Sequence, residues 1–252
     1  MTFQSRPVIA GNWKMNKGPA DTRAFFEAFA NAYAPRTDRS VLVFPPALSF
    51  AAAVEATRSR PDIQLGVQNI HWEKSGAFTG EVSAPMAKEA GAAFVLIGHS
   101  ERRHIFGETD EDCRRKVAAA LDAGLIPVLC VGELLEERQA GHVEDVITRQ
   151  LTAGLDVVPG DAADRILIAY EPVWAIGTGV TATPADAAHA HGVLRGLLAR
   201  HFGSNSARVP ILYGGSVKPD NAALLLSAGN VDGLLVGGAS LDPAGFSTIA
   251  SA

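Results

Sequence analysis

One carboxylate stands out among the residues of this 252-residue chain that could do acid–base chemistry. Glu171 ends the apolar run 166–170 and is followed by Pro172. Because a proline disfavours helical geometry in the residue before it, Glu171 must leave the run extended and cannot cap a helix. A carboxylate fixed at the edge of a largely apolar interior could act as a general base, and a solvated rim glutamate is the alternative.

A second candidate is His99, which follows the apolar residues 94–98 and precedes a helix predicted to begin around residues 100–103. The positive end of a helix dipole disfavours an imidazolium, so the ring there tends to stay neutral and can donate a hydrogen bond to a carbonyl oxygen. A metal site is the competing interpretation. The seven histidines include no pair at i, i+4 with a third ligand nearby, so we expect no metal.

Other polar residues also follow short apolar runs. They are Asn12 and Lys14, Gln68 and Asn69, Ser100 and Glu101, Glu133, and Ser216. Any one of them could be a solvated or structural residue, but together they indicate one functional site at the ends of these runs.

Glycine clusters follow the last three apolar runs, at residues 177–179, 214–215 and 237–238. Glycine lets backbone amides approach an anion closely, and barrel enzymes often bind phosphate in the loops after strands seven and eight. A single cluster could serve a turn, but three favour a phosphate site. The net charge of −5 makes nucleic acid an unexpected partner, so an anionic ligand must be attracted by local groups such as Lys14 and oriented N–H groups.

Eight short apolar runs must position these side chains. They span residues 8–10, 41–44, 63–67, 94–97, 126–131, 166–170, 211–213 and 234–236. Continuous apolar runs are typical of parallel strands covered on both faces, and segments with helical periodicity lie between them. We therefore predict an α/β fold, a single-domain (β/α)8 barrel over residues 1–252, with its active site at the carboxyl ends of the strands. An open doubly wound sheet is the alternative.

Composition limits the class of protein. Apolar residues make up 47% of the chain, enough for a large core, and two cysteines are too few for a disulfide scaffold. No apolar run approaches the roughly 18 residues that span a bilayer, and the first residues do not resemble a signal peptide. We expect a cytoplasmic protein without a membrane partner.

Five segments resemble the signature segments of the triosephosphate isomerase family. They are residues 10–16, 97–103, 169–179, 213–217 and 235–240, in family order and with family-like spacing. The resemblance implies a TIM barrel in glycolysis and gluconeogenesis. It implies interconversion of dihydroxyacetone phosphate and D-glyceraldehyde 3-phosphate through an enediolate, without cofactor or metal.

The resemblance also implies roles by matching position. Glu171 is the expected base and His99 the neutral electrophile, while Lys14 and Asn12 stabilise developing negative charge and Glu101 supports Lys14. The residues expected to hold the phosphate are Gly177, Ser216, Gly237 and Gly238.

Two further segments gain an interpretation from the family. The expected lid comprises Pro172, Val173, Trp174, Ala175, Ile176, Thr178, Gly179, Val180, Thr181 and Ala182 around Gly177. Val180 occupies a hinge position where the family usually carries lysine. The loop 72–81, with Phe78 and Thr79, resembles the one that inserts into the partner of a homodimer; the residues alone indicate only a polar loop.

Two alternatives remain at this stage. A Schiff-base aldolase on the same barrel needs an interior lysine, and Lys14 is the only strand-end lysine among the chain's six. A catalytically silent phosphate-binding barrel is the other, against which the presence of both Glu171 and His99 argues.

Overall fold

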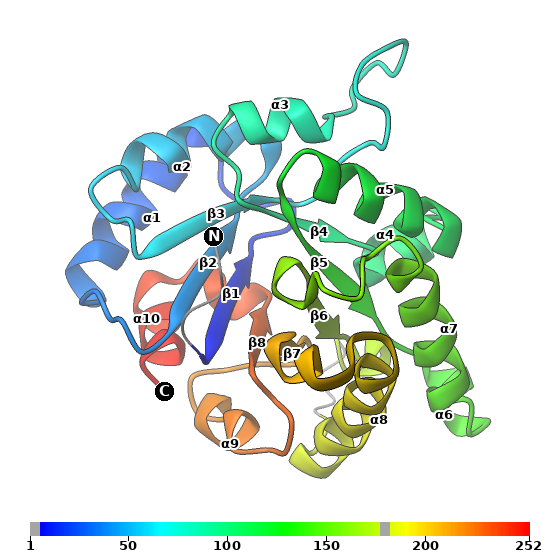
Figure 1. The fold of residues 1–252 in the computed structure, drawn as a ribbon. Coiled ribbons are helices and arrows are strands. Elements are labelled where there is room, and N and C mark those ends of the chain that lie inside the picture. Colours follow the sequence, from blue (N-terminus) through cyan, green and yellow to red (C-terminus); the bar gives the residue numbers. More distant parts are fainter. Residues whose placement is uncertain (1–5, 177–181) are drawn as a thin grey trace.

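The computed structural model describes residues 6–176 and 182–252, and within them eight parallel strands form a closed barrel in the order β1 to β8 (Figure 1). The strands are β1 (Val8–Asn12), β2 (Ser40–Phe44), β3 (Ile63–Val67), β4 (Phe94–Ile97), β5 (Ile126–Val131), β6 (Leu167–Tyr170), β7 (Ile211–Tyr213) and β8 (Gly233–Val236). β8 pairs with β1, Val8 lying opposite Gly233, which closes the sheet. The barrel prediction is confirmed, and the open sheet is excluded.

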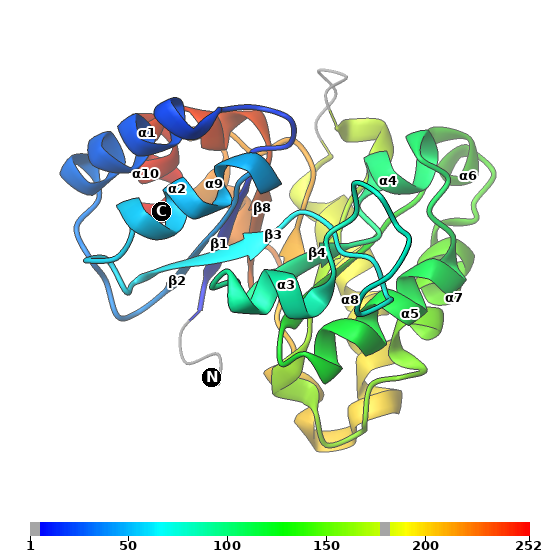
Figure 2. The same ribbon diagram turned by 90° about the horizontal axis from the view of Figure 1, so that it is seen from above.

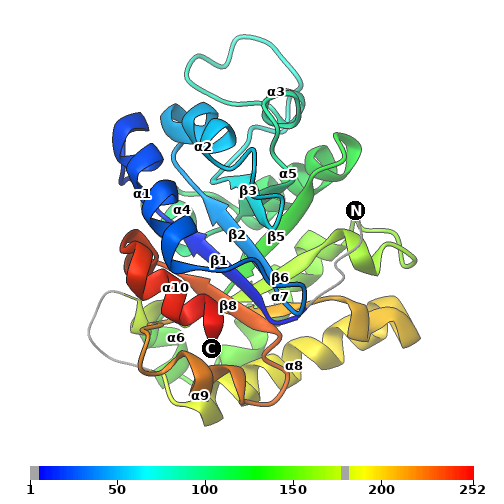
Figure 3. The same cartoon turned by 90° about the vertical axis from the view of Figure 1, so that its left-hand side faces the viewer.

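Helices surround the strands (Figures 2 and 3). They are α1 (Pro19–Ala32), α2 (Phe50–Ala56), α3 (Ala84–Glu89), α4 (Ser100–Ile105), α5 (Asp110–Asp122), α6 (Leu135–Gln139), α7 (Val143–Leu155), α8 (Pro184–Phe202), α9 (Ala222–Leu226) and α10 (Pro243–Ser251). None of the described helices is long and apolar enough to cross a membrane. The segment between β3 and α3 extends away from the barrel (Figure 1).

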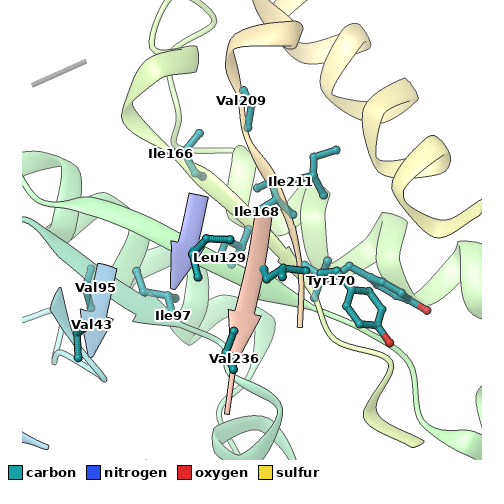
Figure 4. Close-up of a cluster of buried hydrophobic side chains, with 14 of the residues drawn as sticks. Val43, Val95, Ile97, Leu129, Ile166, Ile168, Tyr170, Val209, Ile211 and Val236 are labelled. Carbon is teal, nitrogen blue, oxygen red and sulfur yellow. The ribbon is translucent and has the colours of Figure 1, made fainter. Parts of the chain in front are cut away.

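Alternation along the strands divides the buried side chains into two clusters. The smaller one draws its fully buried members from the strands alone, including Leu42, Phe94 and Leu167, and fills the barrel. The larger one joins the alternate strand residues to the helices, and Figure 4 shows part of it, with Val43, Ile97 and Leu129. Both faces of every strand are therefore covered, which explains the continuous apolar runs in the sequence.

Aromatic side chains line the buried face of the first helix. Phe25, Phe26 and Phe29 are buried on α1. Trp13, just after β1, lies edge-on to Phe25 with 4.7 Å between ring centroids, and Phe29 lies 5.3 Å from Phe246 of α10. This packing fixes the end of β1 against the helices, and with it the start of the segment that carries Lys14.

Turns precede the last two helices. α9 begins at Ala222, after a turn in which the Asn221 side chain accepts the Lys218 N–H at 2.8 Å. The segment after Gly237 begins as the 3-10 turn Gly238–Leu241, before α10.

Candidate active site

His99 stands at the end of β4 and is the N-cap residue of α4. Its Nδ1 accepts a hydrogen bond from the backbone N–H of Glu101 at 3.3 Å. A ring nitrogen that accepts carries no proton, so in the neutral ring the hydrogen is on Nε2. Nε2 lies 3.0 Å from Glu171 Oε1. The arrangement gives the ring a proton to donate and points it at the carboxylate predicted to be the base.

Glu171 leaves β6 as the sequence predicts, and only 2% of it is exposed. Its Oε2 accepts from the backbone N–H of Ser100 at 2.9 Å, and its own N–H donates to Val131 O at 2.8 Å. Gly132 makes room for this path, because a Cβ there would lie 1.7 Å from Glu171 O. The carboxylate is thus held beside His99 by two neighbouring strand ends.

Lys14 projects from the end of β1 with a left-handed backbone, φ 53°. Its N–H donates to Asn12 Oδ1 at 3.0 Å, and its Nζ lies 2.6 Å from Glu101 Oε1. Gln68 donates from Nε2 to the carbonyl oxygens of Lys14 and Phe44, each at 2.8 Å. The spacing marked Gln68 as a strand-end residue but gave no sign that it holds the Lys14 turn.

A cavity of about 380 Å³ opens between these groups. It is lined by Asn12, Lys14, His99, Glu171, Ile176, Gly214, Gly215, Ser216, Val217, Lys218, Leu235, Gly237, Gly238 and Ala239. Seven of the predicted catalytic and phosphate-binding residues, which end or follow β1, β4, β6, β7 and β8, therefore border one space together with Ile176 of the predicted lid. Gly177 and the lid residues Thr178, Gly179, Val180 and Thr181 lie outside the described residues.

A second cavity of about 380 Å³ adjoins the first and shares Asn12, Lys14 and His99 with it. It is also bordered by Gln68 and Glu101, and by Gly80 and Glu81 of the projecting segment. Exposed apolar side chains lie at its edge, with Met15 95% and Phe106 69% exposed. The back of the Lys14 turn is therefore open.

Glu133 does not line the cavity that contains Glu171, although its strand-end position suggested that it would. It is fully buried, accepts from Trp174 Nε1 at 2.8 Å and from the Tyr170 hydroxyl at 3.0 Å, and its carbonyl accepts from Val173 N–H at 3.1 Å. Burial raises the pKa of its carboxyl above the ordinary value. Glu133 holds the start of the predicted lid.

The far end of the predicted lid is fixed as well. Thr183 and Asp186 form a capping box at the start of α8. Arg138 Nη2 donates to Asp186 Oδ1 at 2.5 Å, and the Arg138 guanidinium lies 4.5 Å from the Trp174 ring centroid. One arginine therefore contacts both flanks of the segment.

The site is built from proton-transfer groups and a cation, and in the described part of the chain no three His, Cys, Asp or Glu side chains are placed to hold a metal ion. The family model "Triosephosphate isomerase" matches residues 7–252. The chain belongs to the triosephosphate isomerase family.

Individual members of the triosephosphate isomerase family resemble the chain over nearly its whole length. It is 51% identical over 245 residues to the triosephosphate isomerase of Solibacter usitatus, covering 97% of this chain and 98% of the relative. The Aquifex aeolicus enzyme is 47% identical, with the same coverage. The crystal structure of triosephosphate isomerase from Bartonella henselae superposes with a TM-score of 0.88 at 45% identity, covering 98% of both chains.

Proposed function

We propose that Glu171 and His99 carry out the proton transfers by which this isomerase interconverts dihydroxyacetone phosphate and D-glyceraldehyde 3-phosphate. Glu171 removes a proton from C1 of dihydroxyacetone phosphate, and the electron pair of that C–H bond forms the C1–C2 double bond. The carbonyl π electrons move to the C2 oxygen, where His99 Nε2–H donates a hydrogen bond and then the proton. Glu171 then gives its proton to C2, and His99 takes the proton of the C1 hydroxyl, so that the aldehyde forms and both side chains return to their starting states.

The observation that carries this proposal is the 3.0 Å distance between His99 Nε2 and Glu171 Oε1. A substrate that enters between the two side chains finds a base at the end of β6 and a hydrogen-bond donor at the end of β4. Glu171 must exchange its bond to Ser100 for the substrate carbon, and His99 must turn its donor from the carboxylate to the substrate oxygen. Both changes are short movements of side chains whose backbones are fixed.

Lys14 and Asn12 are proposed to stabilise the negative oxygens of the enediolate. A preformed cation beside the reacting atoms stabilises charge that develops in the transition state. The residues proposed to bind the phosphate are Ser216, Gly237 and Gly238, which line the same cavity as Lys14, together with Gly177. Together these groups attract a dianion to a chain with a net charge of −5.

A coupled assay of isomerisation in both directions tests the activity. Wild-type turnover that falls by orders of magnitude in Glu171→Gln and His99→Ala would support these roles. A Schiff-base aldolase is disfavoured because Lys14 is ion-paired with Glu101 at 2.6 Å, whereas an imine requires a free amine. Borohydride trapping of a substrate adduct on Lys14 would reverse that conclusion.

The segment 172–182 is proposed to act as a lid. Its described ends are held by Glu133 on one side and by the Thr183 capping box on the other. Closure over the substrate would use the binding energy of the phosphate to exclude water from the enediolate.

The chain is also proposed to be a cytoplasmic homodimer whose 252 residues form one domain. Phe78 and Thr79 lie in the projecting segment between β3 and α3, and Phe78 is 42% exposed. The second cavity, open behind the Lys14 turn and edged by Met15 and Phe106, offers a place for the same segment of a second copy. That segment would then support Asn12 and Lys14 from behind.

A further inference from the structure

We propose that Glu108 and Arg103 are positioning residues for His99, which they orient by holding the two peptide groups of Gly98. The inference rests on the role proposed above for His99. Glu108 is 8% exposed, and its Oε2 accepts the Gly98 N–H at 3.1 Å. The Arg103 side chain is 7% exposed, and its Nε donates to Gly98 O at 2.8 Å.

Gly98 is the turn between β4 and the catalytic histidine. Its φ of 70° is left-handed, and a Cβ there would lie 2.6 Å from Arg103 Nη2 and 2.9 Å from Cys113 Sγ. The left-handed backbone favours glycine, and the lack of space for a Cβ requires it. A glycine turn is flexible unless its peptide groups are held, and here a carboxylate holds one and a guanidinium the other.

The two holding side chains are themselves fixed to neighbouring strands. Glu108 Oε1 is ion-paired with Lys116, whose Nζ also donates at 2.8 Å to Asn69 Oδ1, just after β3. Arg103 Nη2 donates to Cys130 O of β5 at 3.1 Å. The turn before His99 is thus braced from the strands on both sides of β4.

This bracing decides where His99 Nε2 points. The ring is otherwise held by the bond from Glu101 N–H to Nδ1 and by Glu171. A displacement of a catalytic group by about 1 Å can cost on the order of 10²-fold in rate. Glu108 and Arg103 line neither of the two cavities described above, so they act through His99 and not on the substrate.

The main variant, called the Leu–Met variant below, combines Glu108→Leu with Lys116→Met. It removes the acceptor of the Gly98 N–H without leaving an unpaired buried ammonium. We expect kcat to fall 10- to 100-fold. The KM and the inhibition constant of inorganic phosphate should stay within about twofold, because the residues proposed to bind the phosphate follow β6, β7 and β8 and not β4. Glu108→Gln, whose amide oxygen can still accept the Gly98 N–H, should restore kcat to within about threefold of the wild type.

The matched control is Asp232→Leu combined with Arg195→Met. Asp232 Oδ2 likewise accepts a backbone N–H, from Ile211 at 2.9 Å, and is likewise paired with a cation, Arg195 Nη2 at 2.5 Å. It lies at the amino end of the barrel, where β7 and β8 begin. We expect the control to lower the melting temperature without changing the kcat of the folded protein.

A double-mutant cycle with His99→Gln distinguishes the positioning of His99 from general damage to the fold. If Glu108 acts through His99, adding the Leu–Met pair to His99→Gln should change kcat by less than about twofold. A folded Leu–Met variant with wild-type kcat, or a loss that multiplies with that of His99→Gln, would overturn the inference.

Arg103→Lys provides a second route should the Leu–Met variant not fold. A lysine can pair with Asp110 but cannot also bond Gly98 O and Cys130 O, so kcat should fall about tenfold with KM unchanged. A wild-type kcat in this variant would also contradict the inference. Failure of the proposed function looks different, because His99→Gln would then leave the isomerase activity of the chain intact.

Discussion

Lys14 Nζ lies 2.6 Å from Glu101 Oε1, so the cation beside the cavity is held by the first turn of α4. The backbone N–H of the same glutamate bonds His99 Nδ1. Glu101→Gln should keep the backbone bond and remove the ion pair. We expect kcat to fall on the order of tenfold in steady-state kinetics, because Lys14 loses the partner that orients it.

Glu111→Gln is the control for this change. Glu111 also accepts from basic side chains, Arg114 and Arg115, but it does so on the outer face of α5. Its loss should leave kcat within error of the wild type. Equal effects of the two substitutions would show that the Lys14–Glu101 pair has no special role.

The fold was readable from the sequence because every strand is buried on both faces and therefore appears as an apolar run. The distances between the side chains of the site could not be predicted from the sequence in the same way. The sequence predicts that His99 and Glu171 share a rim, but their approach to 3.0 Å depends on the left-handed Gly98 and on the space left by Gly132. Such contacts join residues far apart in the chain.

The direction of the Glu133 side chain could not be predicted from the sequence either. Its place after β5 predicts a rim carboxylate, yet it is turned toward Tyr170 and Trp174. These aromatic partners belong to the end of the next strand and the segment after it. Only the pairing of β5 with β6 brings them within reach, so a reading of one strand at a time misses them.

Deletion of residues 176–179 tests the lid. The barrel should still fold and deprotonate substrate weakly, but an enediolate exposed to water can eliminate phosphate. We expect isomerisation to fall and the share of substrate lost as inorganic phosphate and methylglyoxal to rise. Isomerisation and phosphate release are measured side by side, and a fall in the first without a rise in the second would rule out the lid.

Shortening of residues 73–80 tests the dimer. The product should be a soluble monomer by light scattering with far lower turnover, because the Lys14 turn loses its support from behind. Leu224→Ser removes an exposed apolar side chain from α9. It should leave unchanged both the turnover and the oligomeric state measured by light scattering. A monomer with full activity would refute the proposed coupling between assembly and catalysis.

Because His191 is buried, we expect the folded protein to lose stability in mild acid. It is fully buried, its Nδ1 bonds Asn230 O at 3.0 Å, and burial lowers its pKa to about 4. The unfolded chain, with a His pKa near 6.5, binds the proton more readily, so stability is full above about pH 6.5 and falls as the pH drops toward 4. This residue alone should lower the free energy of unfolding by about 2 kcal/mol between pH 7.5 and pH 5.

Urea unfolding of His191→Gln at the two pH values, at one protein concentration, measures that contribution. The variant should be less sensitive to pH than the wild type by about 2 kcal/mol. His142→Gln, at a histidine whose side chain is 61% exposed, should keep the wild-type dependence. The same pH dependence in all three proteins would show that His191 does not titrate in this way.

The central claim is that the Glu171 carboxylate transfers the proton. Glu171→Asp keeps the charge and retracts the carboxylate by about 1 Å, a displacement that can cost on the order of 10²-fold in rate. Its kcat for isomerisation of glyceraldehyde 3-phosphate, measured on folded protein with the inhibition constant of inorganic phosphate as a check on binding, is the most direct test. We expect kcat to fall about 10²-fold with phosphate binding unchanged, whereas a kcat within a factor of two of the wild type would contradict the assignment.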